Sequence, residues 1–180
     1  MTISTAAAHD ILVLAVSGAN ASTPANAVGN AWASLMNTAD GQTTQLWVRE
    51  ALGVAGENTE TVTAAAGLTT AMLLRFTSLT TTQQGATSTA NTGGANLLTP
   101  TTTMSVTTTL PAMLIGVFGG SGNMGTMSWA NIEVLTNLVG AASRLMVGYL
   151  YEAVAGTYTT KPAWTGIRRG AGGLVALQSA

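Results

Sequence analysis

The side chains that most often carry out chemistry are scarce in this chain and are not clustered. There is one histidine, His9, and no cysteine. A hydrolytic triad requires a base, an orienting acid and a nucleophile within hydrogen-bonding reach. Asp10 follows His9 directly, and neighbours on a strand point to opposite faces, so we expect His9 in the turn that enters the first strand. The lack of cysteine excludes disulfides, thiolate metal sites and cysteine nucleophiles.

The carboxylates are spread along the whole chain. They are Asp10, Asp40, Glu50, Glu57, Glu60, Glu133 and Glu152. Metal sites need several convergent ligands. Glu57 and Glu60 are close in sequence, so weak calcium binding by this pair remains an alternative. Glu50 and Glu152 could form the carboxylate pair of a glycoside hydrolase, but they stand at matching places in two similar halves, which favours an architectural role. We therefore expect no enzyme activity, no metal and no cofactor.

Two glycine-containing segments have alternative interpretations. The segment Gly120–Gly125 formally matches the dinucleotide-binding pattern and follows an apolar run. That pattern must open a helix, whereas Thr126-Met127-Ser128-Trp129 is typical of a strand, so we interpret the segment as a flexible hairpin loop. Asp40-Gly41 predicts a hairpin turn, because glycine accepts a positive φ.

The tryptophans and one basic pair are the candidate contact residues. Trp32 and Trp129 recur in the two halves and are predicted to be core residues. Trp47 and Trp164 are possible partner contacts, and either could stack on a sugar ring if exposed. Arg168-Arg169 is either a solvated turn or a contact for an acidic partner surface.

The composition favours association over binding to polyanions. Hydrophobic residues make up 47% of the 180 residues and charged residues only 7%, so the surface has little self-repulsion. A net charge of −1 argues against nucleic acid and anionic membranes as partners. No apolar run approaches the roughly 20 residues of a membrane span, and the first residues lack the features of a signal peptide, so we expect a cytoplasmic origin.

Short runs rich in Val, Ile, Thr, Trp and Tyr, separated by Gly and Asn, predict an all-β fold of about ten strands. We expect strands near residues 10–17, 31–38, 44–51, 58–64, 70–77, 104–109, 111–119, 127–136, 143–153 and 172–179. Both faces of the strand that holds Leu145–Tyr151 are apolar, which predicts cover on both sides. A short helix within Ala64–Leu74 remains an alternative.

The sequence contains two copies of a similar pattern of strand-like segments. Residues 10–18 resemble 111–119, residues 46–50 resemble 146–150, and residues 71–76 resemble 173–178. We expect a single β-sandwich domain over residues 1–180, in which halves of about 9–77 and 104–180 are joined by a polar connector, 78–103. The connector is either a surface crossover loop or an arm that reaches a neighbour, and Met1–Ala8 is either a frayed end or an arm.

These motifs resemble a class of virion proteins from tailed bacteriophages, which have a two-halved jelly-roll sandwich. The resemblance is carried by His9–Gly18, Ala31-Trp32, Leu46–Ala51 and Thr59–Thr63 in the first half, and by Thr107–Ile115 and Ser128-Trp129 in the second. It implies a jelly-roll-like β-sandwich and association with the capsid or tail. It carries no catalytic residues.

The function that we expect is structural. The chain would decorate and cement a phage capsid shell as a homotrimer, contacting the major capsid protein and copies of itself, after assembly in the host cytoplasm. The alternative is a tail- or fibre-associated carbohydrate-binding module for host recognition, with Trp47 or Trp164 on a pyranose. No heptad segment for a stalk is present, which favours capsid decoration.

Overall fold

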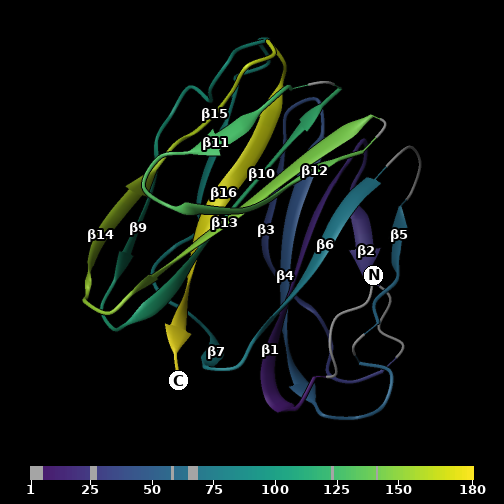
Figure 1. The fold of residues 1–180 in the computed structure, drawn as a ribbon, viewed down its shortest axis with the longest axis vertical. Coiled ribbons are helices and arrows are strands. Elements are labelled where there is room, and N and C mark those ends of the chain that lie inside the picture. The colour runs from purple at the N-terminus through teal and green to yellow at the C-terminus, as the bar shows by residue number, and fades with distance from the viewer. Residues whose placement is uncertain (1–5, 25–27, 58, 65–68, 123, 141) are drawn as a thin grey trace.

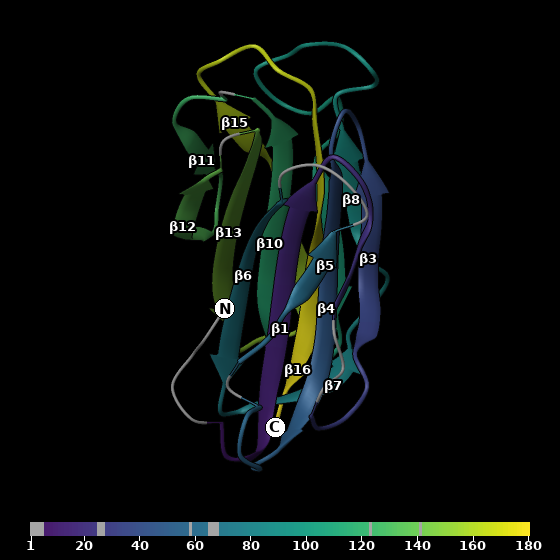
Figure 2. The same cartoon turned by 90° about the vertical axis from the view of Figure 1, so that its right-hand side faces the viewer.

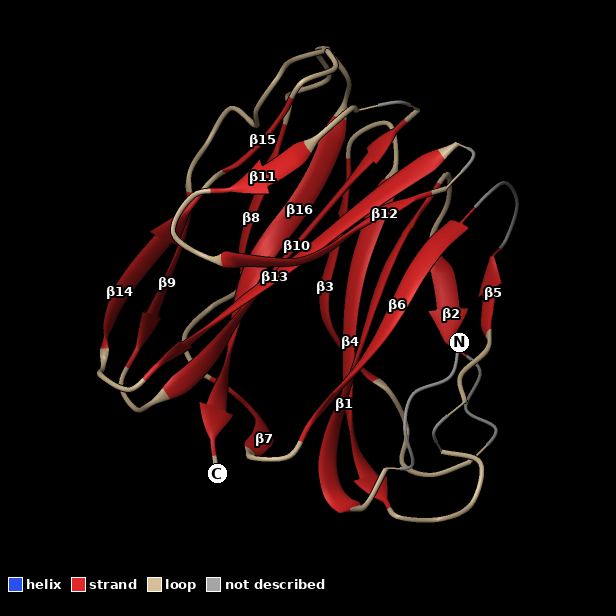
Figure 3. Ribbon diagram, in the orientation of Figure 1, coloured by secondary structure: helices blue, strands red, loops and turns tan. Residues whose placement is uncertain are grey.

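The structure is a computed structural model that describes residues 6–24, 28–57, 59–64, 69–122, 124–140 and 142–180. Within these residues the chain forms sixteen strands and no helix (Figure 3). The prediction of an all-β fold is therefore confirmed, but the expected number of about ten strands is too low. Residues 1–5, which belong to the segment expected to be a frayed end or an arm, lie outside the described residues.

Two large antiparallel sheets form the body of the molecule (Figure 1). The N-terminal sheet has the order β3-β4-β1-β6. Its strands are β1 (Ala8–Gly18), β3 (Ala33–Ala39), β4 (Thr43–Leu52) and β6 (Thr69–Phe76). The C-terminal sheet has the order β12-β13-β10-β16-β7, and β8 also pairs with β16. Its strands are β7 (Leu79–Gln83), β8 (Ser88–Asn91), β10 (Ala112–Ser121), β12 (Glu133–Val139), β13 (Ser143–Glu152) and β16 (Gly170–Ser179).

Three short two-stranded ladders lie outside these sheets. They pair β2 (Ser22–Pro24) with β5 (Val62–Ala64), β9 (Met104–Thr108) with β14 (Gly156–Thr160), and β11 (Met127–Trp129) with β15 (Pro162–Trp164). Figure 1 shows the β9–β14 and β11–β15 ladders beside the C-terminal sheet, and the β2–β5 ladder on the opposite side, beside the N-terminal sheet. The ladders therefore add cover to the outward faces of the sheets.

The apolar core is divided among three clusters. One fills the space between the two large sheets and includes Ile11, Val13, Val117 and Val147. A second lies between the C-terminal sheet and its ladders, and a third lies on the outward face of the N-terminal sheet. Because β1 and β10 are buried on both faces, their sequences are continuous apolar runs instead of alternating ones. Two sheets packed face to face over a shared core are consistent with a β-sandwich.

Two glycines make room for a tryptophan on the outward face of the C-terminal sheet. Gly116 on β10 is directly opposite Gly148 on β13. A Cβ atom at Gly148 would lie 2.8 Å from Trp129 Cδ1, and one at Gly116 would lie 3.1 Å from Trp129 Cζ2. The indole of Trp129 therefore lies directly on the backbone of the sheet, which confirms its predicted place in the core.

The connector 78–103 contains regular structure that its polar sequence did not indicate. β7 and β8 lie within it, and both extend the C-terminal sheet by pairing with β16. Their Thr-rich sequences have one apolar position each, Leu79 and Ala90, that is buried. The helix alternative for residues 64–74 is wrong for residues 69–74, which belong to β6; residues 65–68 are not described.

The register of the sequence repeat also needs correction. Aligning residues 10–18 with 111–119 matches Ile11 to Ala112, but Ile11 faces the core between the sheets and Ala112 faces outward. The inward residues of β10 include Ile115 and Val117. A shift of one residue exchanges the two faces of a strand, so the correct match for the inward-facing Val13 is Ile115 and not Leu114.

Candidate functional site

Trp164 is a core residue and not a surface contact. Its side chain is 4% exposed and its ring is stacked on Phe118, with centroids 5.0 Å apart. The indole Nε1 donates a hydrogen bond to the carbonyl of Leu97 at 2.7 Å. In this position neither face of the ring is open to a sugar. This placement is a correction to the expectation that Trp164 is a free contact residue.

Trp47 is half-buried on the outward face of β4. It packs against the cluster that includes Leu12, Leu14 and Leu73. Its main chain pairs with Leu14 of β1 and Ser34 of β3, so the strand is held on both sides. Part of the ring remains accessible, and its role as a partner contact stays a prediction.

The two arginines of the basic pair have different surroundings. Arg169 forms an ion pair with Asp40 at 2.7 Å across the top of the molecule. The Asp40 carboxylate is buried and also accepts hydrogen bonds from the Thr92 hydroxyl at 2.6 Å and the Gly94 amide at 3.0 Å. Arg168 is exposed, and its guanidinium donates to the carbonyl of Ile167. Arg169 is therefore engaged within the chain, while Arg168 faces solvent.

The electrostatics of Asp40 follow from these contacts. Burial raises the pKa of this carboxyl group, but the hydrogen bonds from Thr92 and Gly94 and the interaction with Arg169 outweigh it, so the pKa of Asp40 lies below its ordinary value. Asp40 also begins the predicted hairpin turn between β3 and β4, where Gly41 has φ of 75°. The turn is confirmed, and its first residue connects three segments that are distant in sequence.

Glu57 and Glu60 have separate structural partners. The Glu57 carboxylate accepts hydrogen bonds from the amides of Leu52 and Val54 at 2.9 and 3.0 Å. Burial raises the pKa of Glu57, but these hydrogen bonds outweigh it and the pKa is lowered. Glu60 is buried beside Arg49, with 3.6 Å between the charged groups. Among the described residues there is no group of three or more His, Asp or Glu side chains that could hold a metal ion.

Arg49 and Trp32 lie beside Glu60 and form a polar cluster with it. The Arg49 guanidinium lies over the ring of Trp32, 4.8 Å from its centroid. The Trp32 Nε1 atom donates to the Glu60 carboxylate at 3.1 Å. Trp32, predicted to be a core residue, is only half-buried: it packs against the outer cluster of the N-terminal sheet and makes polar contacts as well as apolar ones.

The remaining candidate groups for catalysis do not converge. His9 Nδ1 lies 2.6 Å from Glu50 at the exposed start of β1, where His9 has φ of 68°. Glu50 borders a hollow beside Thr80, whereas Glu152 borders a different one beside Tyr158, so the two carboxylates share no site. The segment 120–125 leads into β11, a strand and not a helix, so it does not open the helix that the dinucleotide pattern requires. The hairpin interpretation is also wrong, because β10 pairs with β13 and β16 while β11 pairs with β15; Asn123 lies outside the described residues.

A groove runs along one side of the molecule between the edges of the two sheets. We name it the β6–β12 groove. It consists of a hollow of about 370 Å³ lined by Leu74, Arg75, Phe76, Met113, Leu135 and Tyr149, and one of about 260 Å³ lined by Phe76, Thr77, Ser78, Leu79, Met113, Tyr151 and Ser179. The two hollows share Phe76 and Met113, so they are adjacent. Leu135 is 42% exposed and Tyr151 is 50% exposed, which leaves large apolar side chains in solvent.

The strands at this groove are sheet edges. Figure 2 shows β6 and β12 on the same side of the molecule, away from β3. Among the described residues β6 pairs only with β1 and β12 only with β13. β12 has a bulge between Val134 and Thr136, but β6 has neither a bulge nor a proline or lysine; its one charge, Arg75, pairs with Asp10 at 3.5 Å. The β6 edge therefore lacks most of the devices that block strand addition.

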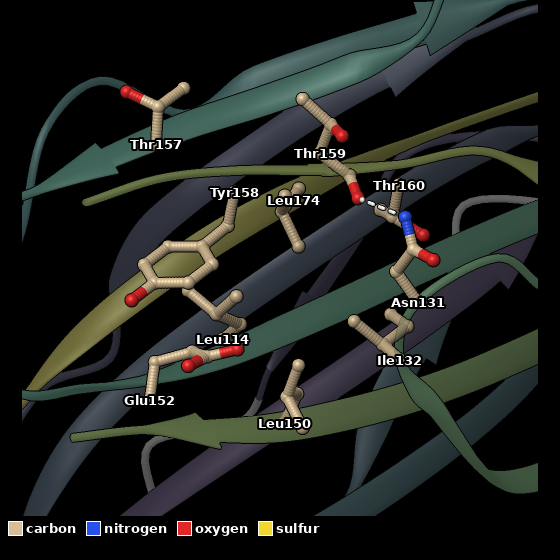
Figure 4. A pocket seen from close by; sticks show the side chains of 10 residues that line it. All are labelled: Leu114, Asn131, Ile132, Leu150, Glu152, Thr157, Tyr158, Thr159, Thr160 and Leu174. Carbon is tan, nitrogen blue, oxygen red and sulfur yellow. Dashed lines mark hydrogen bonds between the residues drawn. The ribbon is translucent and has the colours of Figure 1, made fainter. Parts of the chain in front are cut away.

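A second concave site, the β13–β14 pocket, lies on the outward face of the C-terminal sheet (Figure 4). It has a volume of about 220 Å³. Its residues are Leu114, Asn131, Ile132, Leu150, Glu152, Thr157, Tyr158, Thr159, Thr160 and Leu174. The apolar members come mainly from the sheet, and the polar members lie around them on β14, at the end of β13 and in the turn before β12.

Neither the groove nor the pocket was found from the sequence. Phe76 and Met113 occur in apolar runs that look like ordinary core strands, and only pairing order shows that β6 is an edge. Tyr158 alternates with threonines in Gly156–Thr160, a pattern that predicts a half-buried strand. This alternation is the signal that could have identified the inward positions, Tyr158 and Thr160.

Comparison of the chain with protein families, curated proteins and solved structures gives no match. Within the described residues, no helix is long and apolar enough to cross a membrane.

Proposed function

We propose that this protein is a structural virion protein of a tailed bacteriophage that decorates and cements the capsid shell. In this proposal it acts as a homotrimer that contacts the major capsid protein and neighbouring copies of itself. The observation that carries the proposal is the β6–β12 groove: an apolar, unprotected sheet edge on a chain in which only 7% of residues are charged. Such a surface is better suited to being covered than to remaining in water.

The groove supplies two modes of contact. A strand from a neighbour can add to the free edge of β6 and satisfy its outward amide and carbonyl groups. At the same time, side chains of that neighbour can bury Leu135, Tyr151 and Phe76. Each Å² of apolar surface removed from water contributes about 25 cal/mol, so a small interface repeated over a shell would add up to substantial mechanical resistance.

The two-halved architecture is part of this proposal, and the strand pairing supports it. In the first half β1 pairs with β4 and β6, and β3 pairs with β4. In the second half β10 pairs with β13 and β16, and β12 pairs with β13. The outermost hairpins even have register shifts at matching places, Ser34/Met36 and Val134/Thr136. The central strands of each large sheet come from one half, and β7 and β8 of the connector add to the edge of the second sheet, so the pairing favours a duplicated unit over a jelly roll.

The carbohydrate-binding alternative has less support. It needs an exposed aromatic ring, and Trp164 is buried against Phe118. Trp47 has only part of its ring accessible. We therefore retain capsid decoration as the proposed function.

The test is occupancy on intact particles. Phage particles purified from the producing host should contain the chain in a copy number proportional to the capsid lattice, measured by quantitative mass spectrometry. Density for a β-sandwich trimer should appear on the shell in electron cryomicroscopy. Density confined to the tail tip would instead support the fibre alternative, and absence of the chain from washed particles would reject both.

A further inference from the structure

The β13–β14 pocket combines an apolar base with an acidic and aromatic end. Leu114, Leu150 and Leu174 extend from three neighbouring strands of the C-terminal sheet. Figure 4 shows the ring of Tyr158 and the carboxylate of Glu152 side by side at one end of the pocket. With about 220 Å³, the pocket accommodates a group of a few heavy atoms and not a large ligand.

The hydrogen-bonding groups of this pocket are mainly acceptors. The hydroxyl of Tyr158 donates its proton to the carbonyl of Val154, and the hydroxyl of Thr160 donates its proton to the carbonyl of Ala130. The amide of Asn131 donates one N–H to the carbonyl of Thr159 at 3.3 Å. The Glu152 carboxylate has only acceptor capacity when ionised. A ligand with many hydrogen-bond donors therefore matches these groups better than a ligand that also has many hydrogen-bond acceptors.

The charge of the pocket also favours a ligand with many hydrogen-bond donors. Among the ion pairs of the described residues none involves Glu152. Burial raises the pKa of the Tyr158 hydroxyl, and the negative charge of Glu152 and a hydrogen bond between the two side chains raise it further. A negative carboxylate close to an aromatic ring attracts a cation and repels phosphate or carboxylate ligands.

We propose that the β13–β14 pocket binds a primary alkylammonium group. Glu152 and the Tyr158 ring receive the ammonium, and Leu114, Leu150 and Leu174 contact the alkyl stem. A neutral pyranose is less suited, because it has no charge to pair with Glu152 and because the hydroxyl protons of Tyr158 and Thr160 are already donated within the chain. The ammonium can come from a free amine or from a lysine side chain. This inference concerns a site separate from the β6–β12 groove and does not depend on the proposed function.

The test is a titration of the intact chain with 1-butylammonium chloride, followed by NMR chemical shifts of Tyr158 and the pocket leucines. We expect saturable shifts with millimolar affinity, and about tenfold weaker binding of the neutral isostere 1-butanol. Glu152→Gln preserves the shape of the side chain and should weaken binding of the ammonium about tenfold. Glu50→Gln makes the same charge change on β4, next to a different hollow, and should leave binding unchanged.

Further ligands distinguish the two possible sources of the ammonium group and test a sugar as the competing class of ligand. Nα-acetyl-lysine amide and putrescine distinguish a lysine side chain from a free diamine, and preferential binding of either identifies the source. Equal shifts with 1-butanol and the ammonium, or unchanged affinity in Glu152→Gln, would overturn the proposal. Stronger binding of methyl β-glucopyranoside than of the ammonium would also overturn it and would point to a sugar site. A circular dichroism spectrum and thermal unfolding curve for each variant show whether the fold is intact.

Discussion

At the scale of single residues, the side chain of Asp40 connects segments that are distant in the sequence. It accepts hydrogen bonds from Thr92 and Gly94 in the connector and pairs with Arg169 at the start of β16. One carboxylate thereby fixes the β3–β4 turn of the N-terminal sheet to two segments next to the C-terminal sheet. Because the carboxylate is buried and Arg169 is partly exposed, the hydrogen bonds matter more than the ion pair.

We predict that Asp40→Asn lowers the free energy of unfolding at pH 7 by about 1–3 kcal/mol, because buried donors lose a charged acceptor. Since the pKa of Asp40 is lowered in the folded state, its contribution is present above the unfolded pKa of about 3.9 and is lost as pH falls through the folded pKa. Urea unfolding at pH 7 and near pH 3 should therefore show a smaller difference from wild type at the lower pH.

The exposed Glu133→Gln provides the control for this substitution and should change stability little at either pH. Glu57 also has a lowered pKa, so wild-type and Asp40→Asn proteins should both retain some loss of stability in acid. An equal destabilisation by Asp40→Asn at both pH values would show that the ionised carboxylate is not what matters at this turn.

At the scale of elements, the short strand β15 is held by one large side chain. Trp164 stacks on Phe118 of β10 and donates to the carbonyl of Leu97, so it joins the β11–β15 ladder, the connector and the C-terminal sheet. The ladder has only three residue pairs, and a two-stranded ladder of this size has little stability by itself. Its position therefore depends on side-chain burial more than on backbone pairing.

We predict that Trp164→Ala destabilises the fold by about 3–5 kcal/mol, the usual cost of removing a buried large aromatic. Trp164→Phe keeps an aromatic ring near Phe118 but removes the hydrogen bond to Leu97, and should cost less than Trp164→Ala. Chemical unfolding measures both. Near-neutral stability of Trp164→Ala, with loss of affinity for a glycan, would contradict the buried role and would restore the carbohydrate interpretation.

At the scale of the whole molecule, the sheet edges formed by β6 and β12 lie together and are apolar. Leu135 and Tyr151 project from the C-terminal sheet into the β6–β12 groove, and Phe76 comes from the N-terminal sheet. Charged residues are few, so attraction between molecules at this groove would be mainly hydrophobic. This distinguishes the proposed association from an electrostatic one.

We predict that Leu135→Glu weakens self-association at least about tenfold, because a carboxylate would be buried in an apolar contact. Val154→Glu introduces the same charge at a site that is 69% exposed and outside the groove, and should have no effect. Analytical ultracentrifugation at about 0.05 M and about 0.5 M NaCl should show that association of the wild type is not weakened by salt. A marked loss of association at high salt, or equal effects of the two variants, would argue against this groove.

The sequence was sufficient for the positions of most strands. Val, Ile and Thr in short runs, with Gly and Asn between them, predicted segments that coincide closely with β1, β4, β10, β13 and β16. It was not sufficient for β2, β7, β8, β14 and β15, and the single strand expected near 127–136 is divided between β11 and β12. The polar strands β7 and β8 are formed by pairing with the edge of β16. The sequence also could not show that Trp164 is buried, because the burial of its ring depends on Phe118, which is distant along the chain.

The amino-acid sequence by itself determined that this protein is built of strands, since local propensity and turn residues act over a few neighbours. Only the tertiary structure decided which face of each strand is inward, which edges remain free and where the two concave sites lie. The physical reason is that β1 and β10 are apolar on both faces, so their alternation carries no information about direction. Register, edges and pockets are set by contacts between segments far apart in the sequence, such as Val13 with Leu74 and Gly116 with Gly148.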